Sequence, residues 1–262
     1  MRPILTLTTD FGLEDPFVGI MKGVILGIVP NAQIIDLTHQ IEPQNVTQAA
    51  QMIEAAGSYF PKKTVHLVVV DPGVGGPRRP IASACGTQFF VAPDNGVLTQ
   101  VLKPKSKVYE LTQKKYFLKT LSASFHGRDL FAPVAAWIAK GTALSRMGKR
   151  ITDPVTLKLP YPAFRKGTLS GEVIHIDRFG NLVTNITNNH LKKHFASDVI
   201  VGMGKRQIKN LVGSYSEKKK MEAGSIINSW NRLEIFFREG NAAHQLKCGV
   251  GTKITVTRKD KT

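Results

Sequence analysis

The sequence predicts an N-terminal α/β domain with a mostly parallel sheet flanked by helices, followed by a smaller all-β domain that resembles a barrel. In the first half of the chain, β-branched apolar runs alternate with helical periodicity, which is typical of parallel strands joined by helices. A stretch rich in proline and charge follows, and beyond it come only short strands separated by turns. We expect domains at residues 1–152 and 168–262, with a linker at 153–167.

The first half begins with a β-branched run, Ile4–Thr8, which is predicted to be a strand ending in a polar turn. Asp15 and Pro16 then offer an N-cap acid and a proline at the first helical position, so a helix is expected from there to Pro30. The remaining predicted elements of this half are strand Gln33–Leu37, helix Val46–Phe60, strands Thr64–Val70, Ile81–Ala84 and Gln88–Ala92, and helix Asp129–Lys140.

The second half is predicted to hold short strands only, because its apolar β-formers are interrupted by Gly, Asn, Asp and Pro. The proline and charge of the preceding stretch, at Asp153–Pro154 and Pro160–Pro162, mark the linker. The predicted strands are Leu169–Ile176, Leu182–Ile186, Asp198–Val201, Ser225–Ile227, Leu233–Phe237 and Lys253–Thr257.

Composition places the chain among ordinary globular proteins, with 42% hydrophobic and 21% charged residues in 262. No apolar stretch approaches the length of a membrane span, and the N-terminal one is too short for a signal peptide. Cys85 and Cys248 lie far apart and form no metal-ligand or redox spacing. We therefore expect a cytoplasmic protein without a metal site and without a membrane partner.

The net charge of +17 raises the question of a nucleic-acid partner. Residues 1–100 are slightly acidic, with six Lys and Arg against eight Asp and Glu, so the whole surplus lies beyond residue 100. It forms short lysine-rich clusters, such as Lys103–Lys107 and Lys218–Lys220, that flank apolar segments. Single-strand binding surfaces interleave arginine with aromatic residues, and no such stripe is present. Nucleic acid is therefore not an expected partner, and the charge is interpreted as solvated surface.

Polar residues gather where the predicted strands of the first half end. Asp10, Asp71 and Asn95 each follow a strand almost directly. Because open α/β sheets bind ligands at the carboxyl ends of their strands, we expect these three side chains at the ligand-binding edge.

Two glycine-framed motifs add a guanidinium and an imidazole to that edge. The run from Asp71 to Arg79 carries Arg78, and the motif Phe125–Asp129 carries His126. A carboxylate, a guanidinium and an imidazole brought together can orient or activate a water molecule or another small nucleophile. Because Arg79 adjoins Arg78, the sequence leaves open which arginine turns inward.

These motifs resemble those of the S-adenosyl-L-methionine (SAM) hydroxide adenosyltransferases, a family related to the bacterial fluorinase and chlorinase. The resemblance covers nearly the whole chain, and it implies hydrolysis of SAM to adenosine and L-methionine by SN2 attack of a water-derived hydroxide at ribose C5′. SAM is then the substrate, and no cofactor is expected. The matching motifs are Leu7–Gly12, Asp71–Gly75, Ala92–Gly96, Phe125–Asp129, Phe179–Leu182 and Asn228–Ser229.

The resemblance also implies roles for individual residues. The catalytic triad of the family falls on Asp71, Arg78 and His126, and keeping both the acid and the imidazole favours water over halide as nucleophile. The residues implied in substrate binding are Asp10 at the ribose, Asp177 and Ser229 at the methionine, Phe179 and Asn181 at the adenine, and Asn95 in the same cleft. The resemblance further implies a homotrimer whose active sites lie between the α/β domain of one subunit and the β domain of its neighbour.

One segment departs from the family pattern. Trp230–Arg232 follows Ser229 where an aromatic, glycine and arginine sequence is more usual. Asn231 tolerates a left-handed conformation nearly as glycine does, so the turn itself is expected to survive.

Two other functions remain as alternatives at this stage. A SAM-dependent methyltransferase would carry an acid- and glycine-rich loop like Asp71–Gly76, but that loop should open into a helix, and Pro77 and Pro80 oppose one. A non-catalytic module that binds adenosine or a nucleotide and presents a basic surface to RNA would also fit the charge.

Overall fold

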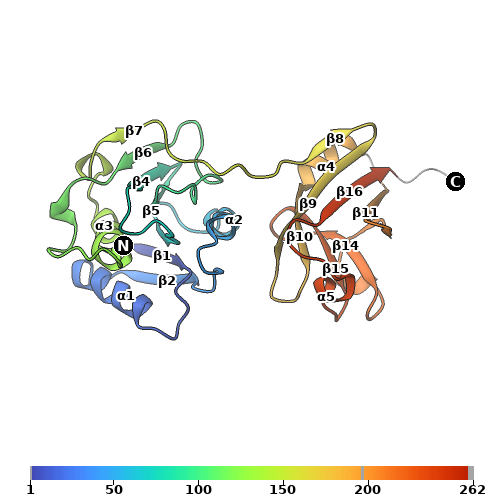
Figure 1. The fold of residues 1–262 in the computed structure, drawn as a ribbon, viewed down its shortest axis with the longest axis horizontal. Coiled ribbons are helices and arrows are strands. Elements are labelled where there is room, and N and C mark those ends of the chain that lie inside the picture. The colour runs from blue at the N-terminus through green and yellow to red at the C-terminus, as the bar shows by residue number, and fades with distance from the viewer. Residues whose placement is uncertain (1, 196–197, 259–262) are drawn as a thin grey trace. The chain divides into compact units, whose positions relative to one another are not determined.

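A computed structural model describes residues 2–195 and 198–258 and divides the chain into two compact units (Figure 1). Unit 1 ends at Leu157 and unit 2 begins at Lys158. Residue 1 and residues 259–262, the outer ends of the two predicted domains, lie outside the described residues. The first unit mixes helices with a sheet and the second is mostly strands, which confirms the predicted fold class.

Unit 1 contains a seven-stranded sheet with the strand order β2-β1-β3-β5-β4-β6-β7. Strands β2, β1, β3 and β5 are parallel, and β4, β6 and β7 continue the sheet with antiparallel pairing. The elements are β1 (Ile4–Thr9), α1 (Phe17–Ile28), β2 (Gln33–Thr38), α2 (Val46–Gly57), β3 (Val65–Val69), β4 (Pro80–Cys85), β5 (Gln88–Pro93), β6 (Lys107–Glu110), α3 (Ala132–Ala139) and β7 (Arg150–Ile151).

Strand β3 lies near the middle of this sheet and is buried on both faces. Successive strand residues point to opposite faces. Leu67 and Val69 pack in the same apolar cluster as α1 and α3, whereas Val68 and Val70 pack in the cluster that includes α2. The sheet is therefore a middle layer between helices, and this explains why every residue of β3 except His66 is apolar.

The helices of unit 1 begin differently from one another. The side chain of Asn45 caps α2 by accepting a hydrogen bond from the amide of Gln48 at 2.9 Å. The prediction that Asp15 caps the first helix was wrong. Helix α1 starts one residue later than expected, because the carbonyl of Pro16 accepts the first helical bond, from Ile20 at 2.9 Å, and no side chain caps it.

Unit 2 contains nine strands and two short helices. One of the strands, β8, lies within the segment predicted as a linker and pairs with the following strand. The elements are β8 (Ala163–Arg165), β9 (Thr168–Ile176), β10 (Leu182–Thr187), α4 (Asn188–His194), β11 (Val199–Met203), β12 (Arg206–Lys209), β13 (Leu211–Val212), β14 (Ala223–Ile227), β15 (Arg232–Phe237), α5 (Ala242–Leu246) and β16 (Lys253–Arg258).

All the strands of unit 2 except β8 form one path, β12-β11-β16-β9-β10-β15-β14-β13, that curves into a nearly closed barrel. Alternate residues of β11 face a buried core and the surface, as expected for a strand with one buried face. The core includes Val173, Ile186, Leu233, Ile235 and Val256. Within the part of the chain that the structure describes, no helix has the length and apolar character needed to cross a membrane.

A buried histidine lies in the middle of the sheet of unit 1. His66 is the cross-strand partner of Thr6 on β1 and of Phe90 on β5. Its Nδ1 lies 2.8 Å from the Thr6 hydroxyl, and its ring stacks on Phe90 at a centroid distance of 4.7 Å. Burial lowers the pKa of His66 to about 4. The neutral form of His66 is therefore part of the folded sheet.

The pKa of His66 predicts a specific pH dependence of stability. Between pH 6.5 and 4 the unfolded chain binds a proton at this residue and the folded chain does not, so the free energy of unfolding falls as the pH falls through that range. From pH 7 to pH 5 the loss due to His66 is about 2 kcal/mol. The free energy of unfolding of His66→Gln, measured with urea, should fall between these two pH values by this amount less than that of the unaltered protein. Equal declines in the two proteins would show that His66 is not neutral in the folded state.

Candidate active site

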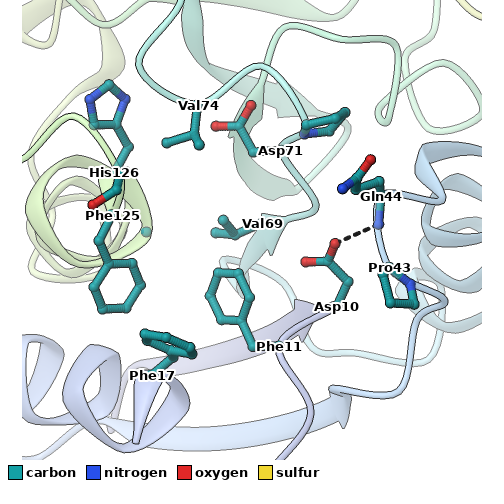
Figure 2. Close-up of a pocket in the computed structure, with 13 residues that line it drawn as sticks. Asp10, Phe11, Phe17, Pro43, Gln44, Val69, Asp71, Val74, Phe125 and His126 are labelled. Atoms are coloured by element: carbon teal, nitrogen blue, oxygen red, sulfur yellow. Dashed lines mark hydrogen bonds between the residues drawn. The ribbon is translucent and has the colours of Figure 1, made fainter. Parts of the chain in front are cut away.

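A cavity of about 430 Å³ opens where β1 and β3 end (Figure 2). One side of it is aromatic, since the rings of Phe11, Phe17 and Phe125 lie edge to face with centroids 5.2 to 5.9 Å apart. The lining also includes two carboxylates and an imidazole. The lining residues are Asp10, Phe11, Phe17, Pro43, Gln44, Val69, Asp71, Pro72, Val74, Ser124, Phe125, His126 and Gly127.

The carboxylate of Asp71 and the guanidinium of Arg78 form a forked ion pair in the loop between β3 and β4. Nε of Arg78 donates to both carboxylate oxygens at 3.0 and 2.9 Å, and Nη2 donates to Oδ2 at 2.5 Å. Only 5% of the Asp71 side chain and 11% of the Arg78 side chain are exposed. A planar guanidinium bound in this way fixes the orientation of the carboxylate.

The same guanidinium joins His126 to the pair. Nη2 of Arg78 lies 2.7 Å from Nδ1 of His126. A guanidinium can only donate hydrogen bonds, so Nδ1 must accept and the neutral imidazole must carry its proton on Nε2. Burial, followed by the positive charge of Arg78, lowers the pKa of His126 below its ordinary value. In this state His126 offers an N–H donor and does not present a free basic nitrogen.

Arg79 turns away from this group, which settles the question that the sequence left open. Its Nε donates to Oδ2 of Asp94 at 2.8 Å, and its Nη1 donates to Oδ1 of Asp153 at 3.0 Å. Arg78 is therefore the arginine that contacts Asp71 and His126.

His126 is held by an unusual helical turn. Residues Gly127–Phe131 form a π-helical turn that leads directly into α3, so the helical segment begins two residues earlier than predicted. Such turns recur at functional sites because they shift the side chains next to them. Within the turn, the buried carboxylate of Asp129 accepts a bond from the amide of Ser122 at 2.7 Å, which ties the preceding loop to the helix.

A glycine lets the loop of Asp71 approach the loop of His126. Gly75 has φ of 76°, and a Cβ atom at this position would lie 2.4 Å from the carbonyl oxygen of Ala123. Any larger residue would separate the two loops. Gly75 thus allows the acid and the imidazole, 55 residues apart in the sequence, to share one guanidinium.

Asp10 lies on the opposite side of the cavity from His126 (Figure 2). Its Oδ2 accepts a hydrogen bond from the amide of Gln44 at 2.8 Å. Gln44 itself has φ of 67°, a left-handed conformation that turns its amide toward the acid. No bond to Oδ1 of Asp10 is found among the described residues, so this oxygen can accept a hydrogen bond from a ligand.

Asn95 does not line the cavity. Its side-chain amide donates to the carbonyl oxygen of Val70 at 2.8 Å, and its Oδ1 accepts from the amide of Val97 at 3.1 Å. Both ends of the side chain therefore bind the backbone of unit 1.

Three of the predicted substrate residues share one turn of unit 2, between β9 and β10. Oδ1 of Asp177 accepts from the amides of Phe179 and Asn181, at 2.9 and 2.8 Å, and Oδ2 accepts from the Asn181 side chain at 3.0 Å. The Phe179 side chain is left 75% exposed, although aromatic rings are usually buried. The structure thus brings Asp177, Phe179 and Asn181 together and presents an aromatic face to solvent.

Ser229 lies on another turn of unit 2, between β14 and β15. Asn228 organises this turn, since its Oδ1 accepts from the amides of Trp230 and Arg232 at 3.0 and 3.1 Å. Asn231 adopts φ of 58°, as its tolerance of the left-handed region allows. The turn therefore forms despite the departure from the family pattern.

A buried acid, Glu234, is hydrogen-bonded to the turn that carries Ser229. Glu234 accepts hydrogen bonds from the Asn228 amide at 2.9 Å and from the Tyr215 hydroxyl at 2.8 Å. Burial raises the pKa of the Glu234 carboxyl, and the nearby charge of Asp177 adds to this. Asp177 thus lies close enough to Glu234, the acid bonded to Asn228, to influence its pKa.

Sequence reasoning missed several residues of the site. Phe11 and Phe125 belong to motifs that were singled out, and their hydrophobicity next to polar turns was the available signal. Gln44 gave no signal, because its contribution is a backbone amide. Within residues 2–195 and 198–258, no three His, Cys, Asp or Glu side chains are grouped so that they could hold a metal ion.

Family models match both units of the chain. The model described as SAM hydroxide adenosyltransferase N-terminal domain matches residues 5–148, and the model of the C-terminal domain of the same family matches residues 171–255. Together they cover most of the chain.

Individual relatives agree with these matches. An (R)-S-adenosyl-L-methionine hydrolase from Salinispora tropica is 34% identical over 260 residues, which are 97% of this chain and 98% of the relative. A fluorinase from an Actinoplanes species is 29% identical over 73% of this chain and 74% of its own. A solved structure of an uncharacterized conserved protein from Thermotoga maritima has a TM-score of 0.89 at 38% identity, and covers 97% of this chain and 100% of that one.

The contact between Arg78 and His126 can be tested without any substrate. We expect Arg78→Met to raise the pKa of His126, because a positive charge that disfavours the imidazolium is removed and the charge of Asp71 is no longer paired. Titration of the His126 ring protons by NMR measures this shift directly. Arg146→Met, which removes an exposed arginine of the same unit, should leave the His126 titration unchanged. A fall in the pKa in Arg78→Met would contradict the assigned contact.

Proposed function

We propose, because the chain belongs to the SAM hydroxide adenosyltransferase family, that it hydrolyses S-adenosyl-L-methionine to adenosine and L-methionine. The observation that carries this proposal is the match to an (R)-S-adenosyl-L-methionine hydrolase over nearly the full length of both chains. The cluster of Asp71, Arg78 and His126 beside a cavity supports it.

The chemistry requires little of the protein because a sulfonium is an excellent leaving group. The oxygen of a water molecule forms a bond to ribose C5′ while the bond from C5′ to sulfur breaks, and both electrons of that bond go to the sulfur. Methionine leaves as a neutral thioether, and the oxygen of the water keeps one proton as the 5′-hydroxyl and gives the other to a base. Catalysis then depends on aligning the water opposite the sulfur and removing the second proton.

The geometry suggests a role for each member of the triad. Asp71 is the basic group, since its ionised carboxylate lines the cavity and can receive the proton. His126, with its proton on Nε2, donates a hydrogen bond that orients the water. Arg78 holds the carboxylate and the imidazole in fixed positions relative to each other. These three residues are the proposed catalytic residues.

Substrate binding is proposed to involve both units. Asp10 accepts hydrogen bonds from the ribose hydroxyls through its unbonded oxygen, and Asp177 and Ser229 hold the amino and carboxylate groups of the methionine. Phe179 and Asn181 contact the adenine. No cofactor is required, because SAM itself is the substrate.

We also propose a homotrimer that acts in the cytoplasm. The residues that line the cavity all belong to unit 1, whereas four of the proposed substrate residues belong to unit 2. A site completed by the β unit of a neighbouring subunit would combine the two sets. Cys85 and Cys248 are free thiols, which suits a reducing compartment.

The loop after β3 argues against a methyltransferase. In that class the glycine-rich loop opens into a helix whose N-terminus faces the cofactor. Here the loop leads from Asp71 into strand β4, which starts at Pro80. A small-molecule hydrolase therefore fits the loop better than a methyltransferase does.

Product analysis tests the proposed function. Incubation of the purified protein with SAM and no methyl acceptor should yield adenosine and methionine in equal amounts, as measured by liquid chromatography and mass spectrometry. Asp71→Asn and His126→Gln should each lower kcat by about 100-fold or more, because a base or an orienting donor is lost. Asp198→Asn, an exposed carboxylate of unit 2, serves as the matched control. Absence of adenosine in this incubation, or unchanged rates in both triad variants, would disprove the assignment.

A further inference from the structure

The turn after β5 lies between the two ends of the loop that carries Asp71 and Arg78. Strand β5 is hydrogen-bonded to β3 on one side and to β4 on the other. The catalytic loop leaves the sheet at the end of β3 and returns at the start of β4. The residues that follow β5, Asp94 and Asn95, are therefore placed to contact both ends of that loop.

Asn95 holds the first end. Its Nδ2 donates to the carbonyl oxygen of Val70 at 2.8 Å, and Val70 is the residue before Asp71. Its Oδ1 accepts from the amide of Val97, which fixes the side chain against its own turn. The amide of Asn95 thus sets the position at which the loop leaves the sheet.

Asp94 holds the second end. Its Oδ2 accepts from Nε of Arg79 at 2.8 Å and forms an ion pair with Nη2 at 2.6 Å, and Arg79 is the residue after Arg78. The amide of Asp94 also donates to the carbonyl oxygen of Arg79 at 2.8 Å. The Asp94 side chain is 1% exposed, so its carboxylate interacts with protein groups and not with solvent.

The turn is itself fastened to the end of unit 1. Oδ1 of Asp94 accepts from the amide of Val155 at 2.8 Å. Gly96 has φ of 92°, and a Cβ atom there would lie 2.8 Å from Cγ of Leu157. Only glycine allows the 155–157 segment to pack so closely on the turn. The turn therefore has fixed contacts on three sides.

We propose that Asp94 and Asn95 are positioning residues that set the distance between the catalytic carboxylate of Asp71 and the guanidinium of Arg78. This inference rests on the proposed function for its kinetic consequence, and on the contacts above for its structural one. Asp94 acts through Arg79, and Asn95 acts through the Val70 carbonyl. Neither residue lines the cavity, so neither is proposed to touch the substrate.

The fixed ends of the loop matter because the triad depends on several short hydrogen bonds. Three hydrogen bonds of 2.5 to 3.0 Å join Arg78 to Asp71, and one of 2.7 Å joins it to His126. The loop that carries them contains glycines at three positions, 73, 75 and 76, which permit many conformations when nothing restrains the ends. A displacement of about 1 Å in a catalytic group can cost about 100-fold in rate. Fixing both ends of the loop prevents such a displacement.

The first test measures the His126 titration by NMR in the whole protein without substrate. In Asp94→Asn the guanidinium of Arg79 loses its buried partner, so Arg78 should shift and the pKa of His126 should rise. Arg79→Lys keeps the positive charge but loses the planar guanidinium, and it should also raise the pKa of His126. This variant is expected to fold, because 27% of the Arg79 side chain is exposed. Asp153→Asn makes the same chemical change at the exposed partner of Arg79 and is the matched control.

The second test measures the kinetics of the same variants with SAM. Asp94→Asn and Arg79→Lys should lower kcat by about 10- to 100-fold and change KM less than about threefold, because alignment is disturbed and substrate contacts are not. Asn95→Asp, which places an acceptor against the Val70 carbonyl, should behave like them. Asp153→Asn should stay within about twofold of the unaltered protein.

The outcomes separate the two proposals. An unchanged His126 titration in folded Arg79→Lys and Asp94→Asn overturns the positioning role, whatever the kinetics. An equal change of the His126 titration in Asp153→Asn also overturns the positioning role, since the loss of any charge near Arg79 would then have the same effect. Failure of the unaltered protein to release adenosine overturns the proposed function alone, because the NMR titration needs no substrate.

Discussion

The buried ion pair between Asp71 and Arg78 is the interaction on which the rest of the site depends. Removing two charges from water is costly, and only the forked geometry and the added bond to His126 offset that cost. The same guanidinium decides which imidazole nitrogen carries the proton, so one side chain fixes both the orientation of the acid and the tautomer of the histidine. A site without Arg78 would have an acid and an imidazole but no fixed relation between them.

The sheet topology provides the position for this pair. Because β5 lies between β3 and β4, a loop that leaves at β3 and returns at β4 must pass over the end of β5. The apolar residues of β3 pack against helices on both faces, and they keep the start of the loop rigid. The cavity thus arises at the edge where parallel strands end, which is where open α/β sheets bind their ligands.

Much of this organisation could be predicted from the sequence, because it follows from local patterns. The apolar run Leu67–Val70 before Asp71 identified a strand and the acid at its end, and the ordered motifs identified the family. The choice between Arg78 and Arg79 could not be predicted, since adjacent arginines differ only in the partners that the fold brings to them. Asn95 was expected in the substrate cleft, but its amide binds the backbone, a role that depends on which strand lies beside β5. Strands as short as β7 and β13, of two residues each, carry too little periodicity to be recognised.

Water as the nucleophile is the central claim, and one isotope measurement tests it most directly. The protein is incubated with SAM in water enriched in heavy oxygen, and adenosine and methionine are analysed by mass spectrometry. We expect heavy oxygen in the 5′-hydroxyl of the adenosine and none in the methionine, because the new bond forms at C5′. Adenosine without the label, or label found in the methionine, would contradict attack by water at the ribose carbon.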